Sequence, residues 1–293
     1  MADRPRFGPA GRPPWFKCDM TEVPFLLRDE GLDAFEFQAV RMGMPHQRFS
    51  KEKAETLGRN ARQCDVLLSL HGPYFINLSG APETVEKSVE RLVSSAILAS
   101  WMGAKVVVFH PGYYGKLGRE EALRSCIQAL SKAVERVKSL GIKGVEYGPE
   151  TTGKLSQVGS LDEILCMCEE VDMVRPVVDW AHIHAREGGS IRGLEDYLRI
   201  VETIESRLGS EAAENLHTHF THVEYGSKGE IRHHTLDEEG YGPPFRPLAE
   251  AIAELGLRPT IISESPILDR DAMKMRDILR PVSYTHLTLP TKA

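Results

Sequence analysis

The sequence predicts an α/β fold, a closed (β/α)8 TIM barrel that forms a single domain over residues 1–280. The chain has 293 residues, which suits a barrel of roughly 250 residues. Short β-branched or aromatic runs alternate with longer amphipathic, charged stretches, the pattern of βα units that feed a parallel sheet. An open doubly wound sheet is the alternative. The glycine-rich dinucleotide and P-loop fingerprints of such nucleotide-binding sheets are absent.

Eight candidate strands can be counted, one for each unit of the barrel. They are RFG near Phe7 and the runs 34–40, 65–70, 104–109, 144–147, 175–180, 219–223 and 259–263. Three of the intervening stretches, 83–103, 119–141 and 194–209, read as long helices. Each of the three ends on glycine, which tolerates the left-handed geometry of a helix C-terminus.

The last thirteen residues, 281–293, break this pattern because they are rich in threonine and proline and follow a helix-like stretch. We expect them to form an unstructured or non-native tail.

The composition is that of an ordinary globular protein, with 41% hydrophobic and 27% charged residues. There is no apolar run of roughly 20 residues for a membrane helix and no secretory signal at the N-terminus, so we expect a cytoplasmic protein. The five cysteines are odd in number and lack a C-x-x-C pair, which indicates reduced thiols. The net charge of -6 means that nucleic acid could be bound only by a local basic patch.

Histidines and carboxylates gather where the predicted strands end. Nine of the eleven histidines lie at or beside strands or in the loop after the seventh strand: His71, His110, His182, His184, His217, His219, His222, His233 and His234. The carboxylates that join them are Glu150, Asp179, Glu230 and Glu264. All strands of a barrel point their C-terminal ends at one mouth, so these side chains should converge there.

Several imidazoles and carboxylates in one mouth form a ligand set that suits Zn²⁺, and Mn²⁺ or Fe²⁺ less selectively. Without a cation, four crowded carboxylates would repel one another. Three divalent cations would outweigh four carboxylates and leave a positive centre suited to phosphodiester hydrolysis. A convincing Ser-His-Asp or Cys-His arrangement is missing, and so is the G-x-S-x-G nucleophile elbow.

Five motifs in order along the chain carry a family resemblance. They are LHGPYFINL at 70–78, VVFHPG at 107–112, EYGPETTG at 146–153, VVDWAH at 177–182 and ISESP at 262–266. Together they resemble the endonuclease IV type of apurinic/apyrimidinic endonuclease, over residues 6 to about 280. That family is a TIM barrel with three zinc ions that cleaves DNA 5′ to an abasic site.

The resemblance implies up to three zinc ions that share ligands. The implied ligands are His71, His110 and Glu150 for the first ion; Glu150, Asp179, His219 and Glu264 for the second; and His182, Glu230 and His233 for the third. Glu150, which bridges two ions, is the expected catalytic residue. Mn²⁺ or Fe²⁺ are possible substitutes.

Two segments depart from the family pattern. The family reads roughly His-Leu-Asn-Asp after the seventh strand, whereas this chain reads HFTH; we choose His219, with His217 and His222 as open alternatives. The family also has an aspartate where this chain has Ile231. We expect Glu230, one residue earlier and one methylene longer, to reach the same ion.

The resemblance also implies a partner, double-stranded DNA that contains an abasic site. Tyr74 is the expected wedge where a base is missing, with Phe75 beside it, and Arg41 an expected phosphate contact. We expect a monomer that does not bind membranes. The alternative function is that of a xylose isomerase-like sugar isomerase or epimerase with one or two divalent metals, and a further one is non-catalytic binding of nucleic acid.

Overall fold

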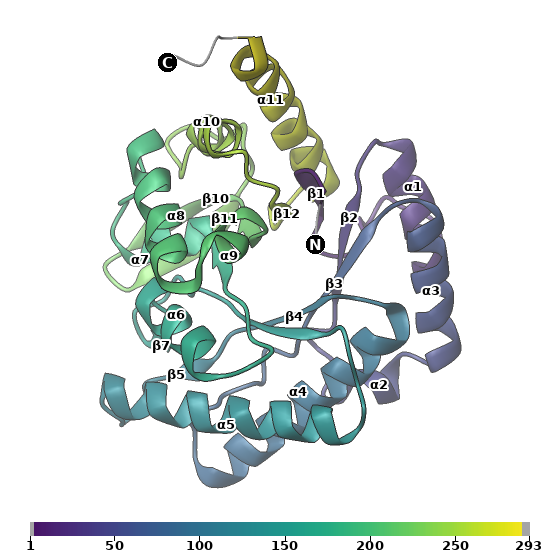
Figure 1. The fold of residues 1–293 in the computed structure, drawn as a ribbon, viewed down its shortest axis with the longest axis vertical. Coiled ribbons are helices and arrows are strands. Elements are labelled where there is room, and N and C mark those ends of the chain that lie inside the picture. Colours follow the sequence, from purple (N-terminus) through teal and green to yellow (C-terminus); the bar gives the residue numbers. More distant parts are fainter. Residues whose placement is uncertain (1–2, 289–293) are drawn as a thin grey trace.

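The computed structural model describes the backbone of residues 3–288 and the side chains of residues 3–282. Eight parallel strands surround a central axis in these residues (Figure 1). They are β1 (Arg6–Pro9), β2 (Ala34–Gln38), β3 (Leu67–His71), β4 (Val106–Phe109), β6 (Glu146–Pro149), β8 (Val177–Asp179), β9 (His217–Phe220) and β12 (Thr260–Ser263). The eight predicted strands and the barrel class are therefore confirmed.

The barrel closes through two four-stranded sheets. Their orders are β1-β12-β9-β8 and β2-β3-β4-β6. Parallel bridges join the sheets at both seams, between Ala10 and Glu36 and between Glu150 and Val177. The seventh strand begins two residues earlier than predicted, at His217, and ends three residues earlier, at Phe220, because His222 already begins a separate hairpin.

Helices cover the outside of the barrel (Figure 1). They are α1 (Val23–Asp29), α3 (Lys51–Gln63), α4 (Pro82–Met102), α5 (Arg119–Ser139), α6 (Leu161–Glu170), α8 (Leu194–Leu208), α10 (Phe245–Leu255) and α11 (Asp269–Thr288). The three long helices predicted from the sequence are α4, α5 and α8. Gly103 follows α4 with φ of 75°, a conformation that costs other residues free energy and glycine very little. One extensive core of buried apolar side chains joins strands and helices.

The loops that follow the strands carry additional short elements on the C-terminal side of the barrel. They are α2 (Pro45–Arg48), the paired β5 (Gly112–Tyr113) and β7 (Gln157–Val158), α7 (Trp180–Arg186), and the hairpin of β10 (His222–Gly226) and β11 (Gly229–His234). The remaining short helices are η1 (Met20–Glu22) and α9 (Ser210–Glu214). The hairpin and α7 matter most for function, because both bring histidines over the barrel mouth.

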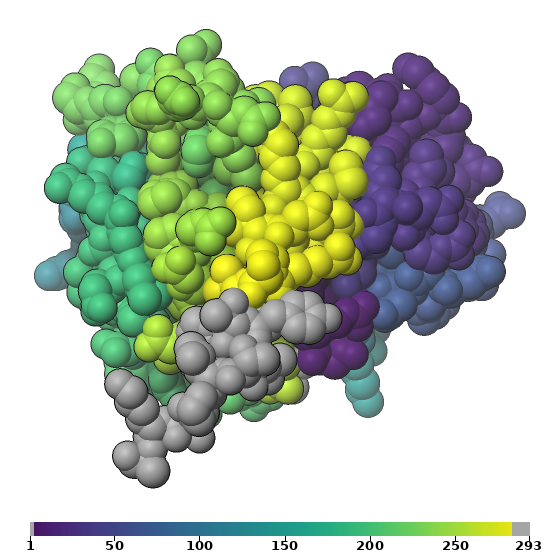
Figure 2. All heavy atoms as spheres, turned by 90° about the horizontal axis from the view of Figure 1, so that it is seen from above, coloured from purple at the N-terminus to yellow at the C-terminus, as the bar shows by residue number. Residues whose placement is uncertain are grey.

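Helix α11 extends into the expected tail. It continues through Pro281 to Thr288. The segment from 281 is thus helical as far as Thr288, while residues 289–293 lie outside the described residues. Figure 2 shows the yellow C-terminal segment beside the purple N-terminal one, and α11 packs on β1.

Two further expectations concern the whole chain. Among the residues that the structure describes, no helix combines the length and the apolar character needed to span a membrane. All five cysteines are free thiols, in agreement with the prediction from their spacing.

Candidate metal centre

The structure brings the nine predicted ligands together at the C-terminal mouth of the barrel. They come from the ends of strands, from the first turn of α7 and from β11. Part of the set lines a pocket of about 300 Å³, together with Tyr74, Tyr113 and Lys154. The barrel thus assembles in space residues that are distant in sequence, as expected from strand ends that face one mouth.

The first cluster consists of His71, His110 and Glu150. The Nε2 atoms of His71 and His110 lie 3.3 Å and 3.1 Å from Oε2 of Glu150. His71 and Glu150 are buried, and His110 is partly exposed toward the pocket. Three potential ligand atoms therefore converge on one point.

The second cluster consists of Glu150, Asp179, His219 and Glu264. Nδ1 of His219 lies 3.0 Å from Oε1 of Glu150 and 3.3 Å from Oε1 of Glu264. Asp179 ends β8, and its Oδ1 accepts the backbone N–H of His182 at 2.7 Å as the N-cap of α7. Because Glu150 offers one oxygen to each cluster, it joins the two.

The third cluster consists of His182, Glu230 and His233. The two carboxylate oxygens of Glu230 each lie 3.4 Å from an Nε2 atom, one of His182 and the other of His233. Ile231 is 57% exposed and belongs to none of the clusters. Glu230, and not Ile231, therefore faces both histidines of this cluster.

Hydrogen bonds to the backbone orient three of the histidines. Nδ1–H donates to a carbonyl oxygen in His71 (Gly72, 2.9 Å), His182 (Thr151, 2.8 Å) and His233 (Glu264, 3.1 Å). A neutral imidazole that donates from Nδ1 carries its lone pair on Nε2. The Nε2 lone pairs therefore face the carboxylates of the first and third clusters.

Several of these atoms lack a hydrogen-bond partner although they are buried. They are Oε2 of Glu150, Oδ2 of Asp179 and Nε2 of His233. Buried polar groups are nearly always satisfied, and an exception calls for an explanation. Cations between the facing lone pairs, one in each cluster, would satisfy these three atoms.

The pKa shifts of the groups at the mouth also favour a bound cation. Burial opposes ionisation of Glu150, but the imidazoles of His219 and His110 outweigh it and hold its pKa well below the usual range. Burial raises the pKa of Asp179. Burial works against a charged His233, yet the carboxylate of Glu230, whose Oε1 lies 3.4 Å from Nε2 of His233, raises the pKa of His233 to about 9. Burial also opposes ionisation of Glu230, but the imidazoles of His233 and His182 lower its pKa to about 2. The mouth thus stabilises positive charge at its centre.

The ligand atoms of each cluster lie within 4.8 Å of one another, which leaves room for a bound ion between them. Nitrogen and carboxylate oxygen donors suit Zn²⁺, and Mn²⁺ or Fe²⁺ with less selectivity. The residues present therefore fit divalent cations.

Other histidines of the sequence lie outside these clusters. His217 faces Glu36, at 3.1 Å from its Nε2 to Oε2, and His222 lies on the hairpin. His184 accepts the backbone N–H of Ile191 at 3.2 Å, and burial lowers its pKa to about 4. Of the three histidines left open after strand seven, only His219 is therefore in the second cluster.

Sequence reasoning missed Glu36 and Gly153. Glu36 is fully buried in the middle of β2; a charge inside an apolar parallel strand was the available signal. A Cβ atom on Gly153 would lie 2.7 Å from Cβ of Glu230 and 3.0 Å from Cδ2 of His182. Glycine here lets the loop after β6 approach the third cluster.

The two residues expected to contact DNA lie on adjoining loops at the rim. Tyr74 is 54% exposed, and its ring stacks on that of His110 with centroids 5.7 Å apart. Its backbone N–H donates to the carbonyl oxygen of Val40, which directly precedes Arg41. Arg41 is exposed. The Tyr74 ring thus lies beside the first cluster, and Arg41 follows the residue that the Tyr74 backbone contacts.

Known proteins are similar in sequence to most of this chain. The uncharacterized protein MJ0133 of Methanocaldococcus jannaschii is 34% identical over 268 residues, 91% of this chain and 94% of that protein. A protein named probable endonuclease 4 of Mycoplasma pneumoniae is 25% identical over 241 residues, 77% of this chain and 79% of that protein.

Solved structures share the fold. Endonuclease IV from Thermus thermophilus superposes with a TM-score of 0.69 at 21% identity and covers 96% of this chain and 100% of that one. Solved sugar epimerases superpose with TM-scores of 0.61 to 0.67 at lower identity. The family model for the xylose isomerase-like TIM barrel matches residues 25–282. The chain therefore belongs to the xylose isomerase-like TIM barrel family.

Proposed function

We propose that this protein is a metal-dependent phosphodiesterase that hydrolyses double-stranded DNA 5′ to abasic sites, as a monomer in DNA repair. The observation that carries the proposal is the junction of the clusters at Glu150, within reach of both the first and the second cluster. Divalent cations held by the three clusters, zinc in the first place, would supply Lewis acidity toward a phosphodiester.

Four residues of the chain would position the ions and the DNA. Glu150 fixes the spacing of the first two clusters, and Glu230 completes the third on the side of the hairpin. Tyr74 would fill the gap left by the missing base, because an aromatic wedge can insert into a duplex. Arg41 would contact a phosphate and thereby position the strand. The relative named probable endonuclease 4 supports this assignment.

A sugar isomerase or epimerase is the rival, since the same barrel hosts both chemistries and the fold alone does not choose between them. The third cluster favours the phosphodiesterase, because the rival needs only one or two metals. A sugar isomerase or epimerase would exchange protons on a ketose or an aldose, and its activity would not depend on Tyr74 or Arg41.

The decisive assay uses protein loaded with zinc and a duplex with one abasic site. We expect a single nick on the 5′ side, abolished by EDTA and restored by Zn²⁺ or Mn²⁺. An intact duplex of the same sequence is the substrate control. Folded, metal-loaded protein that leaves the abasic duplex intact, or that epimerises a ketose instead, would contradict the proposal.

A further inference from the structure

Glu36 lies directly beneath the metal centre, in a group that we call the inner cluster: Glu36, His217 and His219. Glu36 is fully buried, and its carboxylate accepts four hydrogen bonds. The donors are Ser69 Oγ at 2.9 Å, Gln38 Nε2 at 3.1 Å, His217 Nε2 at 3.1 Å and His219 Nε2 at 3.2 Å. Four donors satisfy a carboxylate, so a buried negative charge is tolerated at this point.

His219 connects the inner cluster to the second cluster through opposite sides of one ring. Its Nε2 faces Glu36, while its Nδ1 faces Glu150 at 3.0 Å and Glu264 at 3.3 Å. A neutral imidazole carries one N–H and one lone pair. If Nε2 donates to Glu36, the lone pair of Nδ1 points into the second cluster.

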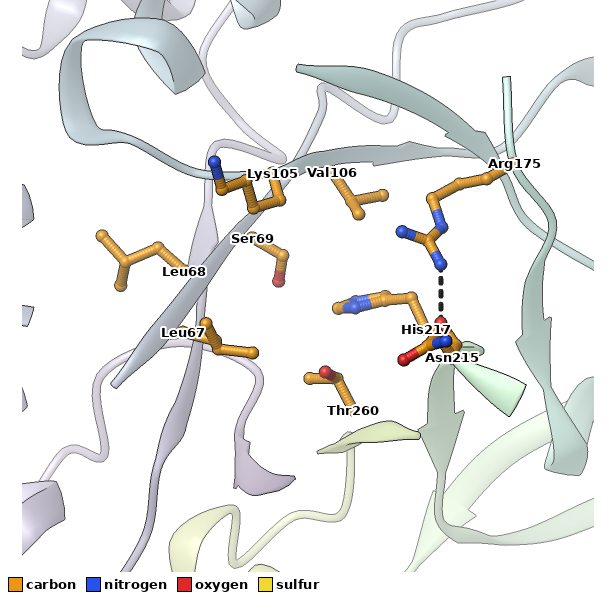
Figure 3. Close-up of a pocket in the computed structure, with 9 residues that line it drawn as sticks. All are labelled: Leu67, Leu68, Ser69, Lys105, Val106, Arg175, Asn215, His217 and Thr260. Atoms are coloured by element: carbon orange, nitrogen blue, oxygen red, sulfur yellow. Dashed lines mark hydrogen bonds between the residues drawn. The ribbon is translucent and has the colours of Figure 1, made fainter. Parts of the chain in front are cut away.

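Glu36 differs from the carboxylates above it. Glu150 and Asp179 each have a buried oxygen without a hydrogen-bond partner, whereas Glu36 has none. Figure 3 shows Ser69 and His217 pointing into one pocket from opposite walls. This pocket, at the N-terminal ends of the strands, measures about 70 Å³. Both carboxylate oxygens of Glu36 therefore have hydrogen-bond partners without a bound ion.

We propose that Glu36 is a positioning residue: it holds His219 with its proton on Nε2 and thereby presents Nδ1 as a ligand of the second cluster. The inference rests on the proposed role of that cluster in metal binding. Carboxylates that accept the second N–H of a ligating histidine fix its orientation and raise its basicity, and their loss typically weakens metal affinity about 10–100-fold.

The chain offers a matched pair of variants for the test. Glu36→Gln places an amide where two imidazole N–H groups now donate. Ser69→Ala removes a different donor to the same carboxylate oxygen and leaves the histidines untouched. Zinc affinity is measured by competition with a chelator, melting temperature reports folding, and ¹⁵N NMR of labelled histidine reports the protonated nitrogen. A His219→Gln variant assigns the signal.

In zinc-loaded wild type we expect His219 to carry its proton on Nε2. Glu36→Gln should weaken the binding of one zinc ion about 10–100-fold and change the His219 signal, while Ser69→Ala, which leaves both histidine donors in place, should have a smaller effect on both. Protonation of His219 on Nδ1 in the wild type would overturn the proposal, whether or not Glu36→Gln folds. So would unchanged zinc affinity in folded Glu36→Gln, or a fourth zinc ion in the wild type that Glu36→Gln loses, because Glu36 would then be a ligand itself.

These readouts do not depend on DNA cleavage. If zinc binding and the His219 signal behave as expected but abasic DNA is not cleaved, the proposed substrate fails and the positioning role stands. If the mouth binds no divalent cation, both proposals fail together.

Discussion

The barrel interior holds two regions built from the same kinds of residues, the three clusters at the mouth and the inner cluster beneath them. On β9 the two regions are two residues apart, since His219 reaches the mouth and His217 faces Glu36. At the mouth, Oε2 of Glu150, Oδ2 of Asp179 and Nε2 of His233 are buried without a hydrogen-bond partner. In the inner cluster, both carboxylate oxygens of Glu36 accept hydrogen bonds. The two regions therefore contain the same residue types and differ in whether their buried polar atoms have hydrogen-bond partners.

The largest effect should come from Glu150, which serves two clusters at the mouth. Glu150→Gln removes the charge that two cations would share and should lower kcat for abasic DNA by at least about 10³-fold, the upper range for loss of one electrostatic stabiliser. Zinc content per chain should fall as well.

The control for this variant is Glu146→Gln, a carboxylate at the opposite end of the same strand that pairs with Arg175. It should keep both zinc content and activity. Equal losses of zinc content and activity in the two variants would mean that Glu150 acts through the stability of the barrel. The proposed difference between the mouth and the inner cluster would then be wrong.

Glu230→Gln should weaken zinc binding in the third cluster only. Because Glu230 supplies the only carboxylate to His182 and His233 within that cluster, we expect zinc affinity at one site to fall by at least about 10–100-fold, the loss typical even of an outer partner. Zinc titration monitors this change, and Glu224→Gln on the same hairpin is the control. Three tight sites in Glu230→Gln would contradict the assignment of the third ion.

The pH dependence of zinc binding should show that protons are displaced from the histidines of the third cluster. A proton on Nε2 blocks His233 as a ligand, and Glu230 raises the pKa of His233 to about 9. Below that pH zinc must displace this proton and also that of His182, since burial opposes a charged His182 but Asp179 and Glu150 raise its pKa well above its usual range. Affinity at this site should therefore rise at least about tenfold per pH unit up to about pH 9. Zinc titrations between about pH 6.5 and about pH 9.5 test the slope. A flat profile would show that His233 is already neutral or does not bind.

The smallest effect concerns the rim, where Tyr74 lies beside the clusters without belonging to them. Tyr74→Ala should weaken binding to an abasic duplex about 10-fold, in the range of a lost stacking contact, and leave zinc content unchanged. Fluorescence anisotropy with abasic and intact duplexes measures it, and the loss should be confined to the abasic one. Equal weakening for both would make Tyr74 a general contact.

The sequence was sufficient to predict the barrel and the side chains that meet at its mouth. Apolar runs such as VVVF in β4 mark strands that are buried on both faces, and polar side chains after them must meet at one end. The start of β9 was missed because HTHF is not an apolar run. The continuation of α11 to Thr288 was missed because a threonine- and proline-rich segment resembles a tail.

The distances between side chains at the mouth could not be predicted from the sequence. Whether Glu230 could replace an aspartate depends on a reach of 3.4 Å to two rings, which spacing along the chain does not fix. Glu36 was missed because it lies in the middle of a strand, away from the strand ends where ligands were sought. Its significance depends on contacts across the barrel, from β2 to β9.

The most direct test of the contrast between the two regions is anomalous diffraction from crystals of zinc-loaded protein, measured on both sides of the zinc absorption edge. We predict three anomalous peaks at the mouth, one in each of the three clusters, with the peaks of the first two on either side of Glu150. We predict none among Glu36, His217 and Ser69. A mouth without peaks, or a peak in the inner cluster, would contradict the account.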